Sequence, residues 1–441
     1  MIKLEVEAVA LAAPVSDRLI ILTRYPQLGR AKTRLIPALG QAGATERHRQ
    51  MVEHTLNQAR QLRQQMPLAI EVWFTGATTA EMQAWLGDDL SYQPQQGDDL
   101  GDRLSHAAAM AFQNGCQRVV MIGTDCPFVD SVLLHQAFLR LSPQQVVLGP
   151  AMDGGYYLIG LCQPFLFLFK GITWSTAQVL EQTRAIARAH GLRLHLLPRL
   201  SDVDYPEDLP IWAAATAPLS VIIPVLNEAA SLERTLATVQ TGSYLEVIVV
   251  DGGSQDQTVA IAQQWGAQVI TTTPGRAHQM NVGAAAARGD LLLFLHGDTC
   301  LPLGFDALAR RILSQTGVVG GAFMLQIEGQ SPGLRLVEWG VKWRSRLFQL
   351  PYGDQAIFLK AATFEQIGGF AELPIMEDFV FIQSLRRLGR VAIAPTAVLT
   401  SGRRWQKLGV LKVTLINQLM IVGYRLGVSL VRLARWYRTW R

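Results

Sequence analysis

The sequence predicts two α/β domains in tandem, each built on a mostly parallel sheet that binds a nucleotide. Two apolar runs, 119–122 and 291–295, lead into Asp125 and Asp298, and a cysteine follows each aspartate closely. In an open parallel sheet, ligands collect where the strands end, and a carboxylate placed there can hold the divalent metal of a nucleoside diphosphate. We therefore expect two active sites in one polypeptide.

The first half of the chain alternates strand-like and helix-like segments, which is typical of crossover units in a parallel sheet. Its expected strands are 18–23, 69–74 and 118–123, and its expected helices include 44–65 and 102–114. A Pro-rich segment, 204–218, predicts a closing helix and a linker. We place the first domain at residues 1–216.

The second half repeats this alternation, again as a parallel sheet requires. Its expected strands are 220–224, 246–250 and 267–271, and its expected helices are 229–240, 258–265 and 276–288. We place the second domain at residues 217–402 and a separate basic tail at residues 403–441.

Composition limits the possible functions. A length of 441 residues favours two or three domains, and an apolar content of 49% excludes a disordered chain. Four cysteines without metal-like spacing, and no evident secretory leader, predict a cytoplasmic protein. The net charge of +5 is uneven, because residues 401–441 hold nine Lys and Arg and no acid, which leaves −4 on the other 400 residues. This pattern argues against a nucleic-acid partner and favours peripheral contact of the tail with an anionic membrane.

Polar residues follow the expected strands of the second half. Asp251 could accept a hydrogen bond from a base or a ribose, and Gly252 lets the backbone approach a ligand closely. Arg276 opens a helix, whose N-terminus favours anions such as phosphate. Asp298 would supply a metal ligand. Together these residues predict a nucleotide site.

The motifs of the second half resemble family 2 glycosyltransferases of the GT-A fold, over about residues 218–400. The runs that carry the resemblance are SVIIPVLNE, VIVVDGGSQDQT, GRAHQMNVGAAAARGDLLLFLHGDT, IGGF and MEDF. Within that family, GRAHQMN, LHGDT and YGDQ resemble the subgroup associated with arsenosugar biosynthesis. The resemblance implies inverting transfer of a sugar from a UDP-linked donor to a small or membrane-associated, lipid-linked acceptor.

The resemblance also implies roles for single residues. Inverting transfer needs a base beside the attacking hydroxyl and positive charge on the leaving phosphate. Asp378 is the expected base, with Glu377 as the reserve, and Asp251 with Glu228 would recognise the nucleoside. The expected contacts to the nucleotide-sugar are Pro224, Asn227, Glu228, Asp251, Gly252, Arg276, Asn281 and Asp354.

The expected metal motif departs from the family's usual pair of aspartates and reads His296-Gly297-Asp298. Imidazole suits Mn²⁺ better than Mg²⁺, which prefers hard oxygen ligands. With His296 and Asp298 as ligands, the sequence predicts stronger activation by Mn²⁺ than by Mg²⁺. The alternative is that His296 packs nearby without touching the metal, and the sequence leaves both open.

The segment 334–352 places aromatic rings beside cations. Trp339 and Trp343 could line a site for a sugar or phosphate acceptor. The favoured interpretation is instead an amphipathic helix whose tryptophans belong to the core. For Asp354, on an expected loop just beyond, we favour a role in acceptor binding or in a lid.

A basic loop follows the first expected strand of the first half. It contains Arg24, Gly29, Lys32 and Arg34, and cations on a loop at a strand end suit phosphates. Together with GDDLGDR, GTDCP, DGGYYLIG and DVD, this loop resembles uncharacterised GT-A-like transferases and, distantly, guanylyltransferases that act on molybdenum cofactor or phospholactate.

That resemblance implies a triphosphate site with bound Mn²⁺ or Mg²⁺. Its phosphate ligands would be Arg24, Lys32, Arg34 and Asp153, and its metal ligands Asp125 and Asp204. The Gly-rich repeat usual in such nucleotidyltransferases is missing, and Asp153 could instead be a turn residue. Two alternatives stay open: nucleotidyl transfer by this domain dominates the activity, or the domain binds nucleotide without catalysis.

The basic tail is too short in its apolar part to span a bilayer. Its longest uncharged stretch, Val413 to Tyr424, has twelve residues, whereas a spanning helix needs about twenty. One interpretation is a helix lying on an anionic leaflet. The other is that this stretch packs on the catalytic domain and leaves the terminal arginines exposed.

Overall fold

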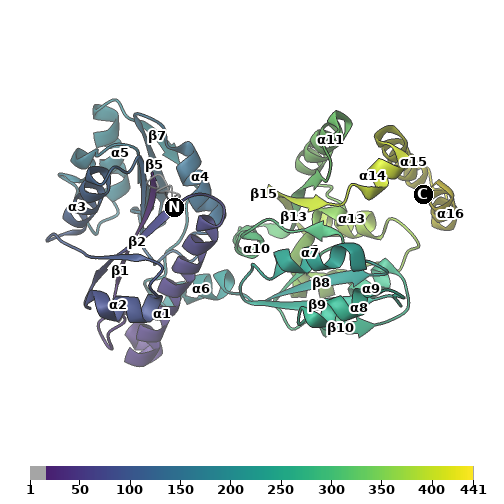
Figure 1. Ribbon diagram of the computed structural model, residues 1–441, viewed down its shortest axis with the longest axis horizontal. Coiled ribbons are helices and arrows are strands. Elements are labelled where there is room, and N and C mark those ends of the chain that lie inside the picture. Colours follow the sequence, from purple (N-terminus) through teal and green to yellow (C-terminus); the bar gives the residue numbers. More distant parts are fainter. Residues whose placement is uncertain (1–15, 441) are drawn as a thin grey trace, which may run out of the picture. The chain divides into compact units, whose positions relative to one another are not determined.

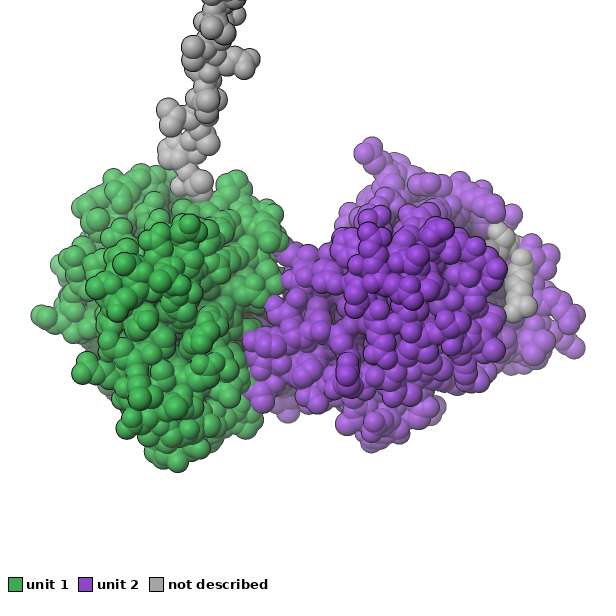
Figure 2. Space-filling view, turned by 60° about the horizontal axis from the view of Figure 1, so that its bottom comes forward, with its two compact units in different colours: residues 1–212 green, residues 213–441 purple. Residues whose placement is uncertain are grey.

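The computed structural model describes residues 16–440, and the chain divides into two compact units between Trp212 and Ala213 (Figure 2). We call residues 16–212 unit 1 and residues 213–440 unit 2. The expected boundary at residue 216 falls close to this division. Residues 1–15 of the expected first domain and Arg441 of the expected tail lie outside the described residues.

Unit 1 is built on a seven-stranded sheet in the order β3-β2-β1-β4-β6-β5-β7. The first four of these strands are parallel, β6 is antiparallel to β4 and β5, and β7 is parallel to β5. The strands are β1 (Asp17–Arg24), β2 (Ala69–Thr75), β3 (Ser91–Pro94), β4 (Arg118–Ile122), β5 (Gln145–Pro150), β6 (Tyr156–Leu161) and β7 (Arg193–Leu196). The α-helices are α1 (Ile36–Arg63), α2 (Thr79–Leu86), α3 (Leu100–Gln113), α4 (Ser131–Arg140), α5 (Val179–Ala189) and α6 (Leu209–Ala215), which crosses into unit 2.

Unit 2 is built on an eight-stranded sheet in the order β10-β9-β8-β11-β14-β13-β15-β12 (Figure 1). The strands are β8 (Leu219–Val225), β9 (Leu245–Asp251), β10 (Gln268–Thr271), β11 (Leu291–Phe294), β12 (Thr299–Cys300), β13 (Val318–Ile327), β14 (Ile357–Lys360) and β15 (Arg390–Thr400). The α-helices of its main body are α7 (Ala229–Val239), α8 (Thr258–Gln264), α9 (Arg276–Ala286), α10 (Phe305–Leu313), α11 (Pro332–Phe348), α12 (Ala361–Ile367) and α13 (Glu377–Leu388).

The two sheets share one topology. If the strands of unit 2 are counted from β8 and the short β12 is set aside, both orders read third, second, first, fourth, sixth, fifth, seventh. The senses also agree, since β11 and β14 pair antiparallel like β4 and β6, and β13 and β15 pair parallel like β5 and β7. The predicted pair of tandem GT-A-like α/β domains is thereby confirmed, although each sheet is mixed beyond its first four strands.

The inner strands follow from their apolar runs. β8 and β11 are almost wholly buried, as expected of parallel strands that are covered on both faces. Side chains start several helices: Asp99 and Asp130 cap α3 and α4, and Thr78 with Glu81 forms a capping box at α2. These local signals put the loops, and the polar residues in them, at the carboxyl ends of the parallel strands.

The tail forms three helices within unit 2, α14 (Arg403–Leu408), α15 (Val410–Arg425) and α16 (Leu430–Trp440). One face of α15 is buried through Val413, Ile416 and Met420. Tyr424 also packs edge to face on Phe379 of α13, with ring centroids 5.5 Å apart. Across residues 16–440, no helix combines the length and the apolarity needed to cross a membrane.

Candidate active site

The carboxyl ends of the parallel strands in unit 2 bring several expected residues to one edge of the sheet. Asp251 ends β9 in register with Val225 of β8 and is 2% exposed. Its carboxylate accepts hydrogen bonds from the backbone amides of Gly253, at 3.0 Å, and Ser254, at 3.1 Å. Asp251 therefore shapes the loop after β9, and its contact with a base or a ribose stays a prediction.

Two amide side chains tie the loops after β8 and β9 together. Asn227, in the left-handed conformation with φ of 56°, accepts a hydrogen bond at 2.8 Å from a backbone amide of the loop after β9. Gln279 of α9 donates to the carbonyl oxygens of Val225, at 2.9 Å, and Val250, at 2.8 Å. A Cβ atom on Gly252 would lie 3.2 Å from the side-chain nitrogen of Gln279, so a glycine fits this close approach. These contacts fix the edge of the sheet.

Two other expected contacts have structural partners. Asn281 exchanges two hydrogen bonds with the backbone of Phe370, at 2.8 and 2.9 Å, and so holds the segment before α13. Pro224 lies inside β8, in register with Val250. A contact of Asn281 or Pro224 with the nucleotide-sugar stays a prediction.

Glu228 and Asp298 converge on one guanidinium nitrogen. Nη2 of Arg403 lies 2.8 Å from Oε2 of Glu228 and 3.3 Å from Oδ2 of Asp298. Glu228 follows β8, Asp298 follows β11, and Arg403 is the first residue of α14, so three distant segments meet here. The side chain of Arg403 is 52% exposed, which leaves it room to move away.

This carboxylate pair suits a divalent cation. Carboxylate oxygens are ligands for both Mg²⁺ and Mn²⁺, and a cationic group already lies between the two side chains. In the part of the chain that the structure describes, no group of three or more His, Cys, Asp and Glu side chains is arranged to hold a metal ion. An ion bound by Glu228 and Asp298 would therefore complete its shell with water or with diphosphate oxygens.

His296 faces a small cavity together with the expected base. The cavity has a volume of about 10 Å³, the size of one water molecule, and its lining includes His296, Gly353, Asp378 and Arg276. Burial, followed by the positive charge of Arg276, lowers the pKa of His296 to about 3, so its imidazole is neutral at pH 7. Asp298 is not part of this lining. The geometry therefore favours the alternative in which His296 packs beside Asp378. The roles of Asp378 as base and of Asp298 as metal ligand stay predictions.

Asp378 is held at the start of α13 by two backbone amides. Its Oδ2 accepts a hydrogen bond from Gly353 at 2.8 Å, and its Oδ1 accepts one from Phe379 at 2.7 Å. The neighbouring Glu377 is 6% exposed, and its Oε1 lies 3.4 Å from Nη1 of Arg276. Burial raises the pKa of Glu377, against the opposing charge of Arg276. Asp378 is thus the more accessible carboxylate of the two.

Asp354 lies in the short helix η4 (Gly353–Gln355), next to Asp378 in space. Burial raises the pKa of Asp354 to about 6, although the charge of Arg344 opposes this shift. Its Oδ1 is buried and has no hydrogen-bond partner among residues 16–440. An orphaned carboxylate oxygen calls for an explanation, and a ligand or a lid movement would satisfy it.

The expectation that Trp339 and Trp343 belong to the core is wrong. Their side chains are 60% and 48% exposed on α11, and their rings pack against each other edge to face with centroids 6.0 Å apart. The buried residues of this helix are Leu334 and Ser345 instead. Both tryptophans are therefore free to meet another surface.

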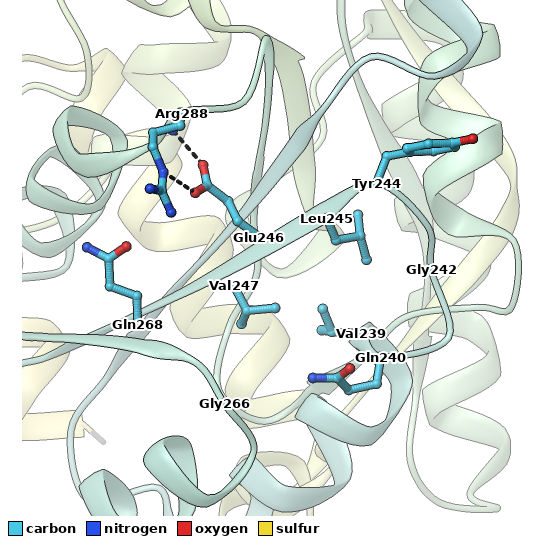
Figure 3. A pocket seen from close by; sticks show the side chains of 10 residues that line it. All are labelled: Val239, Gln240, Gly242, Tyr244, Leu245, Glu246, Val247, Gly266, Gln268 and Arg288. Atoms are coloured by element: carbon cyan, nitrogen blue, oxygen red, sulfur yellow. Dashed lines mark hydrogen bonds and ion pairs between the residues drawn. The ribbon is translucent and has the colours of Figure 1, made fainter.

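Another pocket of unit 2 lies at the opposite edge of the sheet, at the starts of the strands. It has a volume of about 490 Å³ and is lined by the starts of β9 and β10, among them Leu245 and Gln268 (Figure 3). Figure 3 shows Glu246 and Arg288 paired on one side of it, with Nε of Arg288 3.3 Å from Oε2 of Glu246. No expected site residue lines this pocket.

Unit 1 gathers its expected residues at the corresponding edge of its own sheet. Nζ of Lys32 lies 2.7 Å from Oδ1 of Asp125 and 2.6 Å from Oδ1 of Asp204. The side chain of Lys32 is only 8% exposed. Arg34 binds the other oxygen of Asp204 at 3.1 Å and lies over the ring of Tyr205. Lys32 thus occupies the position between two acids that the sequence reserves for a metal.

Other residues around this cluster have local roles. Burial, together with nearby carboxylates, raises the pKa of Asp202 to about 6. Asp153 is exposed and accepts a hydrogen bond from the amide of Gly155 at 2.8 Å, which fits the alternative of a turn residue. Arg24 donates to the carbonyl oxygen of Arg30 at 3.1 Å and so closes the basic loop. Phosphate contacts by Arg24 and Asp153 stay predictions.

Two residues of the unit 2 site are not among the expected ones. From its charge alone, Arg403 is expected to be part of the basic tail. In the structure it lies three residues after the end of β15 at Thr400, and a position just after a strand is the signal that could have identified it as a site residue. Gln279 lies one helical turn after Arg276 in the GRAHQMN run, so both face the same side of the helix. That spacing is the signal for Gln279.

Two family models match the chain in separate places. Residues 56–176 match an uncharacterized protein family conserved in bacteria (DUF2064), and residues 220–358 match glycosyl transferase family 2. The two matches fall in unit 1 and unit 2 respectively.

Several curated proteins that this chain resembles are named glycosyltransferases. An uncharacterized glycosyltransferase of Haemophilus influenzae is 40% identical over 88 residues, which are 19% of this chain and 30% of that protein. A PGL/p-HBAD biosynthesis glycosyltransferase of Mycobacterium bovis is 30% identical over 235 residues, which are 48% of this chain and 87% of that protein. The chain spans 30 to 40% of the length of the first curated relatives that it matches.

Among solved structures, a protein from Desulfovibrio desulfuricans described as a nucleotide-diphospho-sugar transferase is 33% identical, with a TM-score of 0.41. The match covers 45% of this chain and 86% of that one. The identity to the mycobacterial protein, over most of that protein's length, agrees with the family model that matches unit 2. The chain belongs to the family 2 glycosyltransferases.

Proposed function

We propose that unit 2 transfers a sugar, with inversion, from a nucleoside diphosphate to a hydroxyl of a small or lipid-linked acceptor. The observation that carries the proposal is the convergence of Glu228 and Asp298 on one cationic group at the strand ends. A departing diphosphate develops negative charge, and a cation held by these two carboxylates would stabilise it. A UDP-linked donor and a role in arsenosugar biosynthesis are supported by the family resemblance of the motifs.

Asp378 is the proposed base. Two backbone amides fix the directions of its two oxygens, and it lines the same cavity as Arg276 and His296. The acceptor hydroxyl would attack the anomeric carbon and pass its proton to Asp378 while the bond to the diphosphate breaks. Glu377, buried and paired with Arg276, would position that arginine rather than take the proton.

Glu228 and Asp298 are the proposed holders of Mn²⁺ or Mg²⁺. When bound, the ion supplies positive charge to the diphosphate of the donor. Arg403 would have to leave the carboxylates first, and its planar guanidinium would then be free to pair with phosphate oxygens. Its half-exposed side chain supports this movement.

The test uses the full chain, a panel of UDP-sugars and Mn²⁺, with UDP release as the readout. Asp378→Asn keeps the shape and removes the base, so we expect kcat to fall by a factor of about 10² or more. Asp290→Asn is the matched control, because Asp290 is exposed and lies just before β11 in the same unit. Parental turnover by Asp378→Asn would remove Asp378 from the chemistry.

A second function belongs to unit 1, which we propose to bind a nucleoside triphosphate for an adjacent transfer step. The buried Lys32 between Asp125 and Asp204 supports it, since a cation held at strand ends suits phosphate. Burial alone lowers the pKa of Lys32, but the two carboxylates outweigh it and raise the pKa above its usual value. Lys32 is therefore charged and competes with any metal for the two acids.

Pyrophosphate release from each nucleoside triphosphate by the full chain tests this second function. We expect release to fall in Lys32→Met and to persist in Asp378→Asn, because the two sites lie in different units. Triphosphate binding without pyrophosphate release would instead identify unit 1 as a non-catalytic binding module. If the full chain binds no nucleoside triphosphate and releases no pyrophosphate from any, the proposal is rejected.

A further inference from the structure

We propose that α11 and the tail helices α15 and α16 form a docking face for an anionic membrane surface. The inference rests on the proposed function, since it gives the lipid-linked acceptor its source. The occupant to which we commit is a bilayer surface rich in anionic lipid headgroups. Figure 1 shows α11 and the tail helices at the edge of unit 2 away from β10.

One side of α11 carries an exposed apolar stripe. Leu336, Trp339, Trp343 and Leu347 recur every three or four residues, so they share one face of the helix. They are 69%, 60%, 48% and 64% exposed, and Phe348 extends the stripe with 60%. A helix of a water-exposed surface normally buries such a face.

A second stripe runs along α15. Its members are Leu411, Leu415, Leu419, Val422 and Leu426 just beyond the helix, at spacings of three and four residues. They are 43% to 87% exposed, while the opposite face of α15 is buried against unit 2. The expectation that this stretch packs on the domain holds for one face of α15, through Val413, Ile416, Met420 and Tyr424, while the other face points outward.

Among residues 16–440, more than half of the exposed large apolar side chains lie on α11 and the tail helices. The five residues on α11 and seven between Leu411 and Trp436 make twelve of the 21 large apolar side chains that are exposed among residues 16–440. The two helices also touch, since a Cβ atom on Gly333 of α11 would lie 3.3 Å from Val410 of α15. Concentrated apolar surface of this kind marks an interaction site.

Positive charge on and near this face favours an anionic partner. Residues 401–441 hold nine Lys and Arg and no acid. On α11, Lys342 and Arg346 are exposed beside the stripe, and its acid Glu338 is paired with Arg335 at 2.7 Å. Two copies of this face would repel each other through like charges, whereas anionic headgroups attract them. Exposed tryptophans such as Trp339 and Trp343 also suit a membrane interface.

The face is linked directly to the active site. α11 ends at Phe348, five residues before Gly353, whose amide holds Asp378. α14 opens with Arg403 on the carboxylate pair and leads into α15. A membrane contact here would place the catalytic carboxylates close to a lipid-linked hydroxyl.

The experiment measures co-sedimentation of the full chain with vesicles of neutral phosphatidylcholine, alone or with 30% (about one lipid in three) anionic phosphatidylglycerol. We expect binding to the anionic vesicles only, weakening as salt is raised. Trp339→Ser with Trp343→Ser, and separately Leu411→Ser with Leu415→Ser, should each lower the partition coefficient by about tenfold. Leu139→Ser, 66% exposed on α4 of unit 1, is the matched control.

Charge is tested by Arg432→Glu with Arg435→Glu, against Arg140→Glu on α4 as the control. Equal binding to neutral and anionic vesicles, or parental binding by both stripe variants, would overturn the proposal. A change from dimer to monomer in the stripe variants, with vesicle binding unchanged, would also overturn the proposal. The face would then be an interface with a second copy of the chain. Hydrolysis of a water-soluble UDP-sugar by the Leu411→Ser, Leu415→Ser variant should stay parental, which separates a failed membrane contact from a failed transferase.

Discussion

At the scale of single residues, Arg403 is the least expected part of the site. It holds together two carboxylates that the motifs identify, Glu228 and Asp298, and it comes from a segment that charge alone assigns to a tail. A cation between two acids lowers their repulsion and competes directly with a metal ion. If Glu228 and Asp298 hold a metal ion as we propose, Arg403 has to leave the two carboxylates first.

Removing this competitor should strengthen metal binding. We expect Arg403→Gln to lower the Kd for Mn²⁺ by a factor of about three to ten, as for loss of one exposed ion pair. Calorimetric titration of the full chain measures the Kd, and Lys407→Gln on the same helix is the control, since Lys407 is exposed and lies in α14. A weaker Mn²⁺ affinity in Arg403→Gln would mean that Arg403 helps to hold the ion instead.

The raised pKa of Asp354 gives a second residue-scale prediction. Its carboxyl has a pKa of about 6 when folded and 3.8 as the ordinary value. The folded state therefore binds the proton of Asp354 more tightly than the unfolded state does. Below about pH 4 the group is protonated in both states and costs no stability. Between pH 4 and 6 its ionisation increasingly destabilises the folded state, and above pH 6 the full cost is present. We expect Asp354→Asn to gain stability over the parent as pH rises from 4 to 7, by about 1 to 3 kcal/mol.

Urea unfolding of both proteins at pH 4, 5, 6 and 7 measures this difference. The contributions of titrating groups that do not interact with Asp354 cancel when the two curves are subtracted. A stability difference that stays flat across this range would show that Asp354 has an ordinary pKa in the folded protein.

At the scale of elements, the strands next to the site are the ones that the sequence identifies best. The apolar runs before Asp251 and Asp298 predict β9 and β11 because short apolar runs followed by turn residues are typical of buried strands. The antiparallel strands β6 and β14 are not predicted, since nothing in their local sequence distinguishes the sense of pairing. α11 has the predicted helical pattern, but no local signal says which face meets the sheet, so its exposed tryptophans could not be foreseen.

A buried ion pair on α10 supports the start of unit 2. Nη1 of Arg310 lies 2.7 Å from Oδ2 of Asp306, and both side chains are 1% exposed. Arg310 also donates to the carbonyl oxygens of Ala217, at 2.8 Å, and Ser243, at 2.6 Å. It therefore ties α10 to the segments that lead into β8 and β9.

Arg310→Met should strand the buried charge of Asp306 and cost about 3 to 5 kcal/mol of unfolding free energy. Urea denaturation measures the loss, and Arg386→Met, at an exposed position on α13, is the control. Adding Asp306→Leu should recover part of the loss, because no unpaired charge then remains buried. A loss below about 1 kcal/mol in Arg310→Met would mean that the pair has little structural weight.

At the scale of the whole molecule, one topology is used twice with the charges exchanged. In unit 1 the cation, Lys32, follows the first strand, and the acids Asp125 and Asp204 follow the fourth and the seventh. In unit 2 an acid, Glu228, follows the first strand and the cation, Arg403, follows the seventh. The motifs point to the acids in each unit because they lie in the loops after strands. Which cation pairs with these acids, Lys32 or Arg403, depends on the order of the strands in the sheet and could not be predicted from the spacing of residues in the sequence.

The cations of the two sites differ in how accessible they are to solvent. Lys32 is buried and Arg403 is half exposed, so the cation of unit 2 is much easier to replace. We therefore propose sugar transfer by unit 2 and not by unit 1.

The most direct test compares Asp298→Asn with Asp125→Asn in the full chain, with release of UDP from a UDP-sugar in the presence of Mn²⁺ as the measurement. We predict that Asp298→Asn loses turnover by a factor of about 10² or more, while Asp125→Asn keeps the parental rate. Parental turnover by a folded Asp298→Asn protein, or loss of turnover in Asp125→Asn alone, would contradict the account.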